Sequence, residues 1–215
     1  MVFNRAVKFL APLLFLLFFS SNACIDGKTC ASEDKSCSFN EILYSSISVP
    51  PGIYIYSTQK SYQGNIAAYG PDLQISLTNI CAEARLFAQT ISNCGNILPL
   101  TASPTSSVST YTTDFSLDGT LPVRGARGEL IYSQWNLVFS STPTLSMSSA
   151  GVTTEKFWTF ATTGWSYASS SCLDGTLSDN GNVGITGDPN DINLSWGSFA
   201  SDTCDSYRKV LCICY

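Results

Sequence analysis

The part of the sequence that offers the most chemistry is rich in aspartate. From Cys172 to Tyr207 the chain contains six Asp and neither Lys nor Arg. Within it, Asp188-Pro-Asn-Asp191 places oxygen-bearing side chains in a tight turn, and calcium takes about six to eight oxygen ligands. Asp188, Asn190 and Asp191 are therefore a candidate calcium site. The interpretation that we favour is an acidic loop in contact with solvent, and we predict no other cofactor.

A serine–lysine pair is a second pattern with catalytic potential. Ser57-Thr-Gln-Lys60 matches the S-x-x-K spacing of one hydrolase class, and Ser178-Asp-Asn180 matches a second motif of that class. No Lys-Thr-Gly follows, and Ser57 ends an expected strand instead of beginning a buried helix. The chain has no His, which excludes Ser-His-Asp and Cys-His catalysis. We therefore predict that the protein is not an enzyme, with a Ser57–Lys60 hydrolase as the alternative. Carboxylate pairs for glycoside chemistry depend on spatial distances that the sequence does not give.

Tryptophan is a side chain suited to a ligand platform. Trp158, Trp165 and Trp196 lie in the second half of the chain, and tryptophans are highly buried on average. Because Gly197 follows Trp196, we predict that Trp196 is the most exposed of the three and binds ligand.

The first 23 residues are typical of a cleavable signal peptide. After a short basic start, an apolar run extends from Phe9 to Phe19. This run is too short to cross a bilayer of about 30 Å as a helix. Ser21-Asn-Ala23 suits an ordinary signal peptidase, whereas Cys24 directly after it suits lipoprotein processing, in which the thiol receives lipid. Ser21 stands where lipoproteins more often have an aliphatic residue.

The cysteine count favours lipid on Cys24. Nine cysteines lie at positions 24, 30, 37, 81, 94, 172, 204, 212 and 214. An odd count in an exported chain leaves one thiol unexplained, but with Cys24 lipidated the other eight can pair completely. Without His, a Cys/His zinc site is disfavoured, so we predict disulfides. Plain secretion with one free thiol is the alternative.

The charge of the mature chain restricts its partners. Cleavage removes Arg5 and Lys8, and the remaining nine Lys and Arg against sixteen Asp and Glu give a formal net charge of −7. This balance argues against nucleic acid and anionic lipid headgroups as partners. We predict contact with the membrane through the lipid anchor only, at the outer membrane or cell surface.

The rest of the chain is predicted to be a tether followed by one domain. Residues 25–49 are polar and lead to the turn Pro50-Pro-Gly52, so we place the tether at 24–51 and the domain at 52–215. Ile53-Tyr-Ile-Tyr56 favours a strand. Lys209–Tyr215 favours another strand, in which Cys212 and Cys214 face the same side.

One helix is predicted, from Leu77 to Ile91, with Ser76 as its N-cap. Its apolar face consists of Ile80, Ala84, Phe87 and Ile91, with Cys81 beside them. Phe157–Phe160 is predicted to be a buried strand, and 130–139 to be either helix or strand. The Ser- and Thr-rich stretches 101–116 and 140–154, and the stretch 172–207, are predicted to be loops.

Taken in order, these features resemble a C-type-lectin-like fold, and more narrowly a leptospiral lipoprotein family of unknown function with an endostatin-like or lectin-like domain. The matching segments are Ile53-Tyr-Ile-Tyr56, Tyr62-Gln-Gly-Asn65, Cys81-Ala-Glu-Ala84, Phe157-Trp-Thr159 with Trp165, Cys172 with Gly175, Gly181-x-Val-Gly184, Cys204, and Tyr207-Arg-Lys-Val-Leu-Cys212. The resemblance implies an α+β, C-type-lectin-like (endostatin-like) domain that is loop-rich and stapled by disulfides.

The resemblance also implies a disulfide pattern and a function. It implies disulfides between Cys81 and Cys212 and between Cys172 and Cys204. The remaining cysteines, Cys30, Cys37, Cys94 and Cys214, allow three pairings, of which Cys94–Cys214 with Cys30–Cys37 is our preference. The implied function is adhesion: a surface lipoprotein that binds host or environmental protein or glycan. A structural envelope lipoprotein without a ligand is the alternative. The sugar site of calcium-dependent lectins is not carried over, because no Trp-Asn-Asp precedes Cys204.

Overall fold

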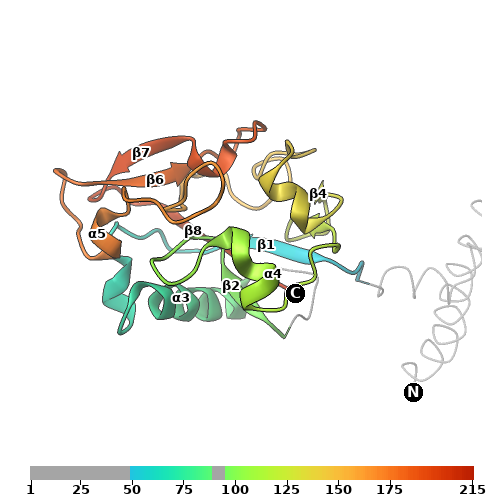
Figure 1. Ribbon diagram of the computed structural model, residues 1–215, viewed down its shortest axis with the longest axis horizontal. Helices are drawn as coiled ribbons and strands as arrows, with labels where there is room; N and C mark the ends of the chain where they lie inside the picture. The colour runs from blue at the N-terminus through green and yellow to red at the C-terminus, as the bar shows by residue number, and fades with distance from the viewer. Residues whose placement is uncertain (1–48, 89–94) are drawn as a thin grey trace, which may run out of the picture. The chain divides into compact units, whose positions relative to one another are not determined.

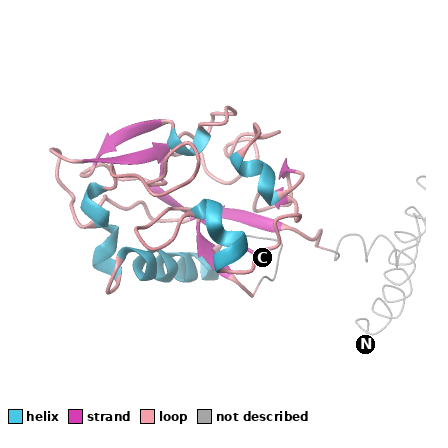
Figure 2. Ribbon diagram, viewed as in Figure 1, coloured by secondary structure: helices cyan, strands magenta, loops and turns pink. Residues whose placement is uncertain are grey.

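The computed structural model describes residues 49–88 and 95–215 (Figure 1). Its strands are β1 (Ile53–Ser57), β2 (Ile97–Pro99), β3 (Val123–Arg124), β4 (Leu130–Tyr132), β5 (Phe157–Trp158), β6 (Val183–Gly187), β7 (Ala200–Thr203) and β8 (Lys209–Cys214). Its helices are α3 (Leu73–Phe87), α4 (Tyr111–Asp114) and α5 (Cys172–Gly175), with 3-10 segments η2 (Ile66–Tyr69), η3 (Val108–Thr110), η4 (Trp135–Phe139) and η5 (Trp196–Ser198). The described part of the chain is therefore mixed, with more sheet than helix, and long loops connect its elements (Figure 2).

The last strand lies at the centre of the sheet. The strand order is β4-β3-β1-β8-β5-β6-β7, and β2 also pairs with β8. On one side β8 is antiparallel to β1, with Tyr54 opposite Cys214 and Ser57 opposite Leu211. On the other side its first residues pair in parallel with β5, and its later residues pair antiparallel with β2. The two ends of the domain are thus held next to each other.

Strand periodicity divides the core into two clusters. Side chains alternate between the faces of a sheet. One face carries Ile53, Ile55, Leu211 and Ile213. The other carries Tyr54, Tyr56, Val210, Cys212 and Cys214, against which α3 packs. Cys212 and Cys214 therefore share a face, as predicted.

The long helix of the described residues, α3, begins earlier than predicted. Its N-cap is Asp72, whose Oδ1 accepts from the amide of Ile75 at 2.8 Å, and not Ser76. The Ser76 hydroxyl instead donates to the Ala67 carbonyl at 3.1 Å. Asp is a strong N-cap, and Leu73 adds one more buried turn to the apolar face.

The face predicted for this helix is present over the described residues. Ile80 and Ala84 are buried against the sheet, together with Leu77 and Cys81. The helix ends at Phe87, and Ile91 lies outside the described residues.

Three stretches predicted to be loops contain more structure than expected. The stretch 172–207 holds an antiparallel hairpin, in which Val183 of β6 lies opposite Thr203 of β7. Residues 101–116 bury Val108 and Tyr111, and residues 140–154 bury Met147. Serine and threonine hydroxyls of these segments bond to nearby backbone groups, as Thr110 does to the Ser107 carbonyl at 2.9 Å. The undecided stretch 130–139 is both a strand, β4, and a 3-10 segment, η4.

The compact unit begins close to the predicted boundary. Val49–Tyr215 form one unit, against a predicted domain of 52–215. The predicted signal peptide and nearly all of the tether lie outside the described residues. Within 49–88 and 95–215, no helix has the length and apolar character needed to cross a membrane.

Candidate functional site

Two disulfides tie the segments of the domain together. Cys81 of α3 bonds to Cys212 of β8, and Cys172 bonds to Cys204, with 5.6 Å between the Cα atoms of each pair. These are the pairs that the resemblance implies. Cys214 is also disulfide-bonded. Cys24, Cys30, Cys37 and Cys94 lie outside the described residues, so lipid on Cys24 and the other pairings stay predictions.

Two glycines lie against the Cys172–Cys204 disulfide. A Cβ atom on Gly64 would lie 2.3 Å from the Sγ of Cys172, and one on Gly184 would lie 2.9 Å from the same atom. The amide of Gly64 donates to the Cys204 carbonyl at 2.7 Å. A side chain at either position would overlap the sulfur, so the backbone can approach this closely only at glycine.

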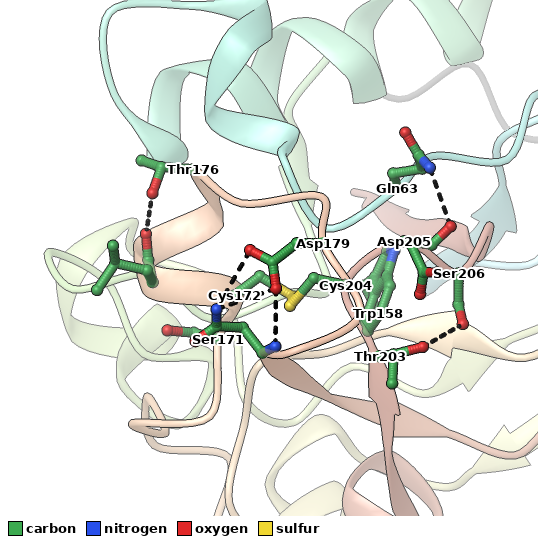
Figure 3. The surroundings of a disulfide bond; sticks show 12 residues. Gln63, Trp158, Ser171, Cys172, Thr176, Asp179, Thr203, Cys204, Asp205 and Ser206 are labelled. Carbon is green, nitrogen blue, oxygen red and sulfur yellow. Dashed lines mark hydrogen bonds between the residues drawn. A yellow bond between two sulfur atoms is a disulfide. The ribbon is translucent and has the colours of Figure 1, made fainter.

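Tyr62 and Trp158 lie beside the same disulfide. The indole of Trp158 donates to the Tyr62 carbonyl at 2.8 Å, and the Tyr62 and Arg208 backbones exchange bonds of 2.7 and 2.9 Å. Figure 3 shows Trp158 next to the disulfide. Separate segments of the resemblance therefore meet at one point of the structure.

Asp179, from the Ser178-Asp-Asn180 motif, closes a turn beside this disulfide (Figure 3). Its Oδ1 accepts from the amides of Gly181 and Asn182 at 2.8 and 2.9 Å and from the Asn182 side chain at 3.0 Å. These bonds, chiefly that from the Asn182 side chain, lower the pKa of the Asp179 carboxyl. This geometry gives Asp179 a structural role.

The backbone after Ser171 forms a left-handed turn. Cys172, Leu173 and Asp174 have φ values of 55°, 51° and 54°, and Gly175 follows with 72°. The Gly175 amide donates to the Ser171 carbonyl at 2.8 Å, which closes one helical turn of the unusual hand. Left-handed helix costs L-residues about 1–2 kcal/mol each, and such strain persists only where the surroundings enforce it.

Tyr167 and the Cys172–Cys204 disulfide hold this turn. The Tyr167 hydroxyl donates to Asp174 Oδ1 and lies 2.6 Å from Ser171 Oγ. Burial, followed by the hydrogen bond to the Asp174 carboxylate, raises the pKa of Tyr167 to about 12. Leu173 is 64% exposed, so apolar packing of this side chain does not explain the strain. Asp174 is one of the six Asp residues of the stretch 172–207, but no sequence pattern indicates its contact with Tyr167; the local signal for the turn is Gly175 directly after Asp174.

The predicted calcium residues form two short turns. Asp188 Oδ1 accepts from the Asn190 amide at 2.8 Å. Asp191 Oδ1 accepts from the amide and side chain of Asn193 at 2.9 and 2.6 Å. Asp191 Oδ2 is buried without a hydrogen-bond partner, and an acceptor in this position would suit a bound cation.

This loop offers fewer carboxylate ligands than a calcium ion needs. Among the described residues, no group of three or more Cys, Asp or Glu side chains is placed to hold an ion. Calcium at Asp188 and Asp191 would therefore need backbone or amide oxygens and water to complete its ligands.

Trp196 is buried, contrary to the prediction that it is exposed. It is 1% exposed, and its indole donates to the Tyr132 hydroxyl at 2.8 Å. Its ring centroid lies 4.7 Å from that of Trp165 and 6.0 Å from that of Phe157. Gly197 permits this packing, because a Cβ there would lie 2.2 Å from Trp165. The glycine marks close approach, and Trp196 is not available to a ligand.

The segment 188–199, which we call the acidic loop, is anchored to the core by its own buried residue Trp196. The Thr159 hydroxyl donates to the Gly197 carbonyl at 2.5 Å, and the Ser148 amide donates to the Pro189 carbonyl at 2.8 Å. The exposed apolar side chains of the loop are Ile192 at 55%, Leu194 at 37% and Phe199 at 50%. An apolar surface on an anchored loop is typical of an interaction site.

The geometry does not support a Ser57–Lys60 pair. Lys60 is bound to Glu83, with 2.8 Å between Nζ and Oε1, and its side chain is 71% exposed. The hydrogen bond that Lys60 donates to Glu83, together with the negative charge of Glu83, raises the pKa of Lys60, whereas a lysine base needs a lowered pKa. Ser57 and Lys60 also line different cavities.

Comparison with known proteins gives no match, either to models of protein families or to curated sequences. Membership of the leptospiral family therefore stays a proposal.

Proposed function

We propose that the protein is an exported surface lipoprotein whose C-type-lectin-like (endostatin-like) domain binds host or environmental macromolecules without catalysing a reaction. Three features support this type of domain: adjacent antiparallel first and last strands, the Cys81–Cys212 bond between helix and last strand, and the Cys172–Cys204 bond around the β6–β7 hairpin. The segments of the resemblance come together around these bonds.

The acidic loop is the binding surface in this proposal, and its anchoring through Trp196 is the observation that carries it. A loop that is already ordered loses less conformational entropy when a partner binds. Ile192, Leu194 and Phe199 supply apolar contact, while Asp188 adds a carboxylate at the start of the loop. The ligand class is a glycan or a matrix protein.

The proposal of a non-enzymatic protein is supported by the position of the serine–lysine pair. Lys60 is engaged by Glu83 at the surface, and Asp179 closes a turn. Attachment to the membrane through lipid on Cys24 is supported by the N-terminal sequence and the odd cysteine count.

The test is a binding screen of the full chain against glycans and matrix proteins, with and without calcium. We expect saturable binding that is weakened by changing Leu194 and Phe199 together to Ser. Leu86→Ser is the matched control, because Leu86 is 81% exposed on α3. Binding that survives the loop change would place the site elsewhere. No saturable binding to any ligand would favour the structural envelope protein.

A further inference from the structure

A separate cavity of about 310 Å³ lies where α3 begins, between this helix, the 104–105 loop and α5. Figure 1 shows α5 next to the beginning of α3. The residues that line the cavity are Ala67, Pro71, Asp72, Leu73, Gln74, Pro104, Thr105, Asp174 and Thr176. It shares no residue with the acidic loop.

The walls of this cavity combine apolar surface with negative charge. Ala67, Pro71, Leu73 and Pro104 supply the apolar part. Asp72 and Asp174 supply two carboxylates, and no Lys or Arg is among the lining residues. A ligand that complements these walls has an apolar stem and a positive charge.

Specific contacts fix the positions of the walls. The Ser103 hydroxyl donates to Gln74 Oε1 at 2.8 Å, which ties the loop before Pro104 to α3. A Cβ on Gly175 would lie 2.6 Å from Leu73 Cδ1, so α5 is packed tightly on the same helix. The left-handed turn therefore sets where Asp174 and Thr176 lie in the wall.

The strain in this turn points to a role for Asp174. The Tyr167 hydroxyl occupies Asp174 Oδ1 and leaves Oδ2 available to a ligand. At Asp72, Oδ1 accepts from the Ile75 amide, so its Oδ2 is likewise available. Strained backbone that the surroundings enforce is concentrated at binding and catalytic sites.

We propose that this cavity binds the side chain of a lysine residue of a partner protein. The alkyl stem lies along the apolar walls, and the ammonium group is held by Asp72 and Asp174. An ammonium is a compact charge that carboxylates from two different segments can share, whereas a guanidinium is best met by the two oxygens of one carboxylate. The start of α3 contributes only about half a positive charge, which two carboxylates outweigh.

This inference goes beyond the proposed function, because it concerns another site and a defined chemical group. It is tested with a small probe, so its outcome does not depend on the macromolecular screen. The probe is Nα-acetyl-lysine methylamide, titrated into the isotope-labelled full chain and followed by NMR. The matched negative probe is the same molecule acetylated on its ε-amine, which keeps the stem and removes the charge.

The variants are chosen to keep the fold. Asn is as good an N-cap as Asp, so Asp72→Asn retains the helix start. Asn also tolerates left-handed backbone, so Asp174→Asn retains the turn. Asp205→Asn is the control, since it removes one exposed carboxylate that does not line the cavity. Melting curves confirm that each variant folds.

We expect the lysine probe to shift the amide signals of Gln74, Thr105 and Thr176. The double change at Asp72 and Asp174 should weaken binding at least about tenfold, and Asp205→Asn should leave it unchanged. Equal binding of the acetylated probe would overturn the proposal. So would an absence of shifts at the cavity residues, or an equal loss in the Asp205→Asn control.

Discussion

Gly64 lies so close to Cys172 that a Cβ atom at position 64 would be 2.3 Å from the Sγ atom. The two residues are far apart in the sequence, and the contact joins the segment after β1 to the disulfide that closes the β6–β7 hairpin. The contact lies in the interior, because Trp158, Cys172 and Cys204 are all buried. The Trp158 indole donates a hydrogen bond to the neighbouring Tyr62 carbonyl. The disulfide thus stabilises this region both as a covalent link and through close packing of its sulfur atom against Gly64.

Replacing Gly64 with Ala should destabilise the domain by about 1–3 kcal/mol, because the added methyl overlaps a sulfur that cannot move away. Gly164→Ala is the matched control: a Cβ there meets no atom within 4 Å. That change should be neutral or stabilising by up to about 1 kcal/mol, since alanine restricts the unfolded chain. Urea unfolding of both variants measures the difference. Equal stabilities would show that the backbone at Gly64 adapts.

Removing the Cys81–Cys212 bond should destabilise the domain by about 2–5 kcal/mol. Cys81→Ala and Cys212→Ala should give similar losses, because either change breaks the same bond between two fully buried residues. The double variant should therefore be little worse than either single one, as a double-mutant cycle by chemical unfolding would measure. Additive losses would mean that the two side chains contribute independently, contrary to the observed bond.

Asp202 should make stability depend on pH in the acidic range. Its carboxylate lies 2.7 Å from Arg208 Nε and 3.3 Å from Lys156 Nζ. Partial burial opposes ionisation, but the hydrogen bonds and charges of Arg208 and Lys156 outweigh it, and the pKa of Asp202 is lowered. A folded-state pKa below the unfolded value of about 3.9 gives stability that is present above pH 3.9 and lost as the pH falls through the folded value.

The measurement for Asp202 is the unfolding free energy of the wild type and Asp202→Asn across the acidic range. The variant should be less stable at neutral pH, and the two curves should converge as the pH falls below about 3.9. Asp205→Asn, which removes an exposed carboxylate without a described ion pair, should follow the wild type. A constant gap at all pH values would mean that Asp202 acts through packing and not through its charge.

Replacing Cys24 with Ala should move the protein from the detergent phase to the aqueous phase in phase partitioning. The reason is that the mature chain has a net charge of −7 and is predicted to contact the membrane only through lipid on this residue. A wild type that already partitions into water would contradict the anchor. Mass spectrometry of the N-terminal peptide distinguishes lipid loss from altered cleavage.

The parts of the fold that sequence predicts are those with a strong local pattern. β1 and β8 are runs of β-favouring residues, and Cys212 and Cys214 fall on one face because the strand period is two. The sequence does not predict the hairpin β6–β7, because glycine, serine and aspartate weaken its strand pattern. Its pairing depends on β5 and on the Cys172–Cys204 bond, which are contacts made in the folded chain.

The site was harder to predict than the fold for the same reason. Leucine does not favour positive φ, so the sequence gives no signal for it at Leu173; Asp174 tolerates it better, and contacts with Tyr167 and the disulfide hold the turn. The sequence predicts that Trp196 is exposed because Gly197 follows it. In the structure, the lack of a side chain at Gly197 instead lets the backbone pack closely against the Trp165 ring. A local residue pattern does not distinguish exposure from close packing at a glycine.

Calcium at millimolar concentration should raise the melting temperature through the acidic loop. Asp191 Oδ2 is buried without a donor, and an unpaired buried carboxylate oxygen is costly unless a cation or water reaches it. Extracellular calcium modules bind at about 10⁻⁴–10⁻³ M, and a ligand at a hundredfold excess over its Kd stabilises the folded state by about 2.7 kcal/mol. Magnesium should do little, because it requires a tighter octahedral shell.

The control for calcium is the pair of changes Asp188→Asn and Asp191→Asn, which should abolish the rise in melting temperature. Asparagine preserves the turn bonds to the amides of Asn190 and Asn193 but removes the charge that holds the ion. The melting temperature is followed in a calcium titration at fixed ionic strength, so that general screening is constant. An unchanged melting temperature would leave the acidic loop without a metal. The loop would then owe its order to Trp196 and to the hydrogen bonds at Gly197 and Pro189.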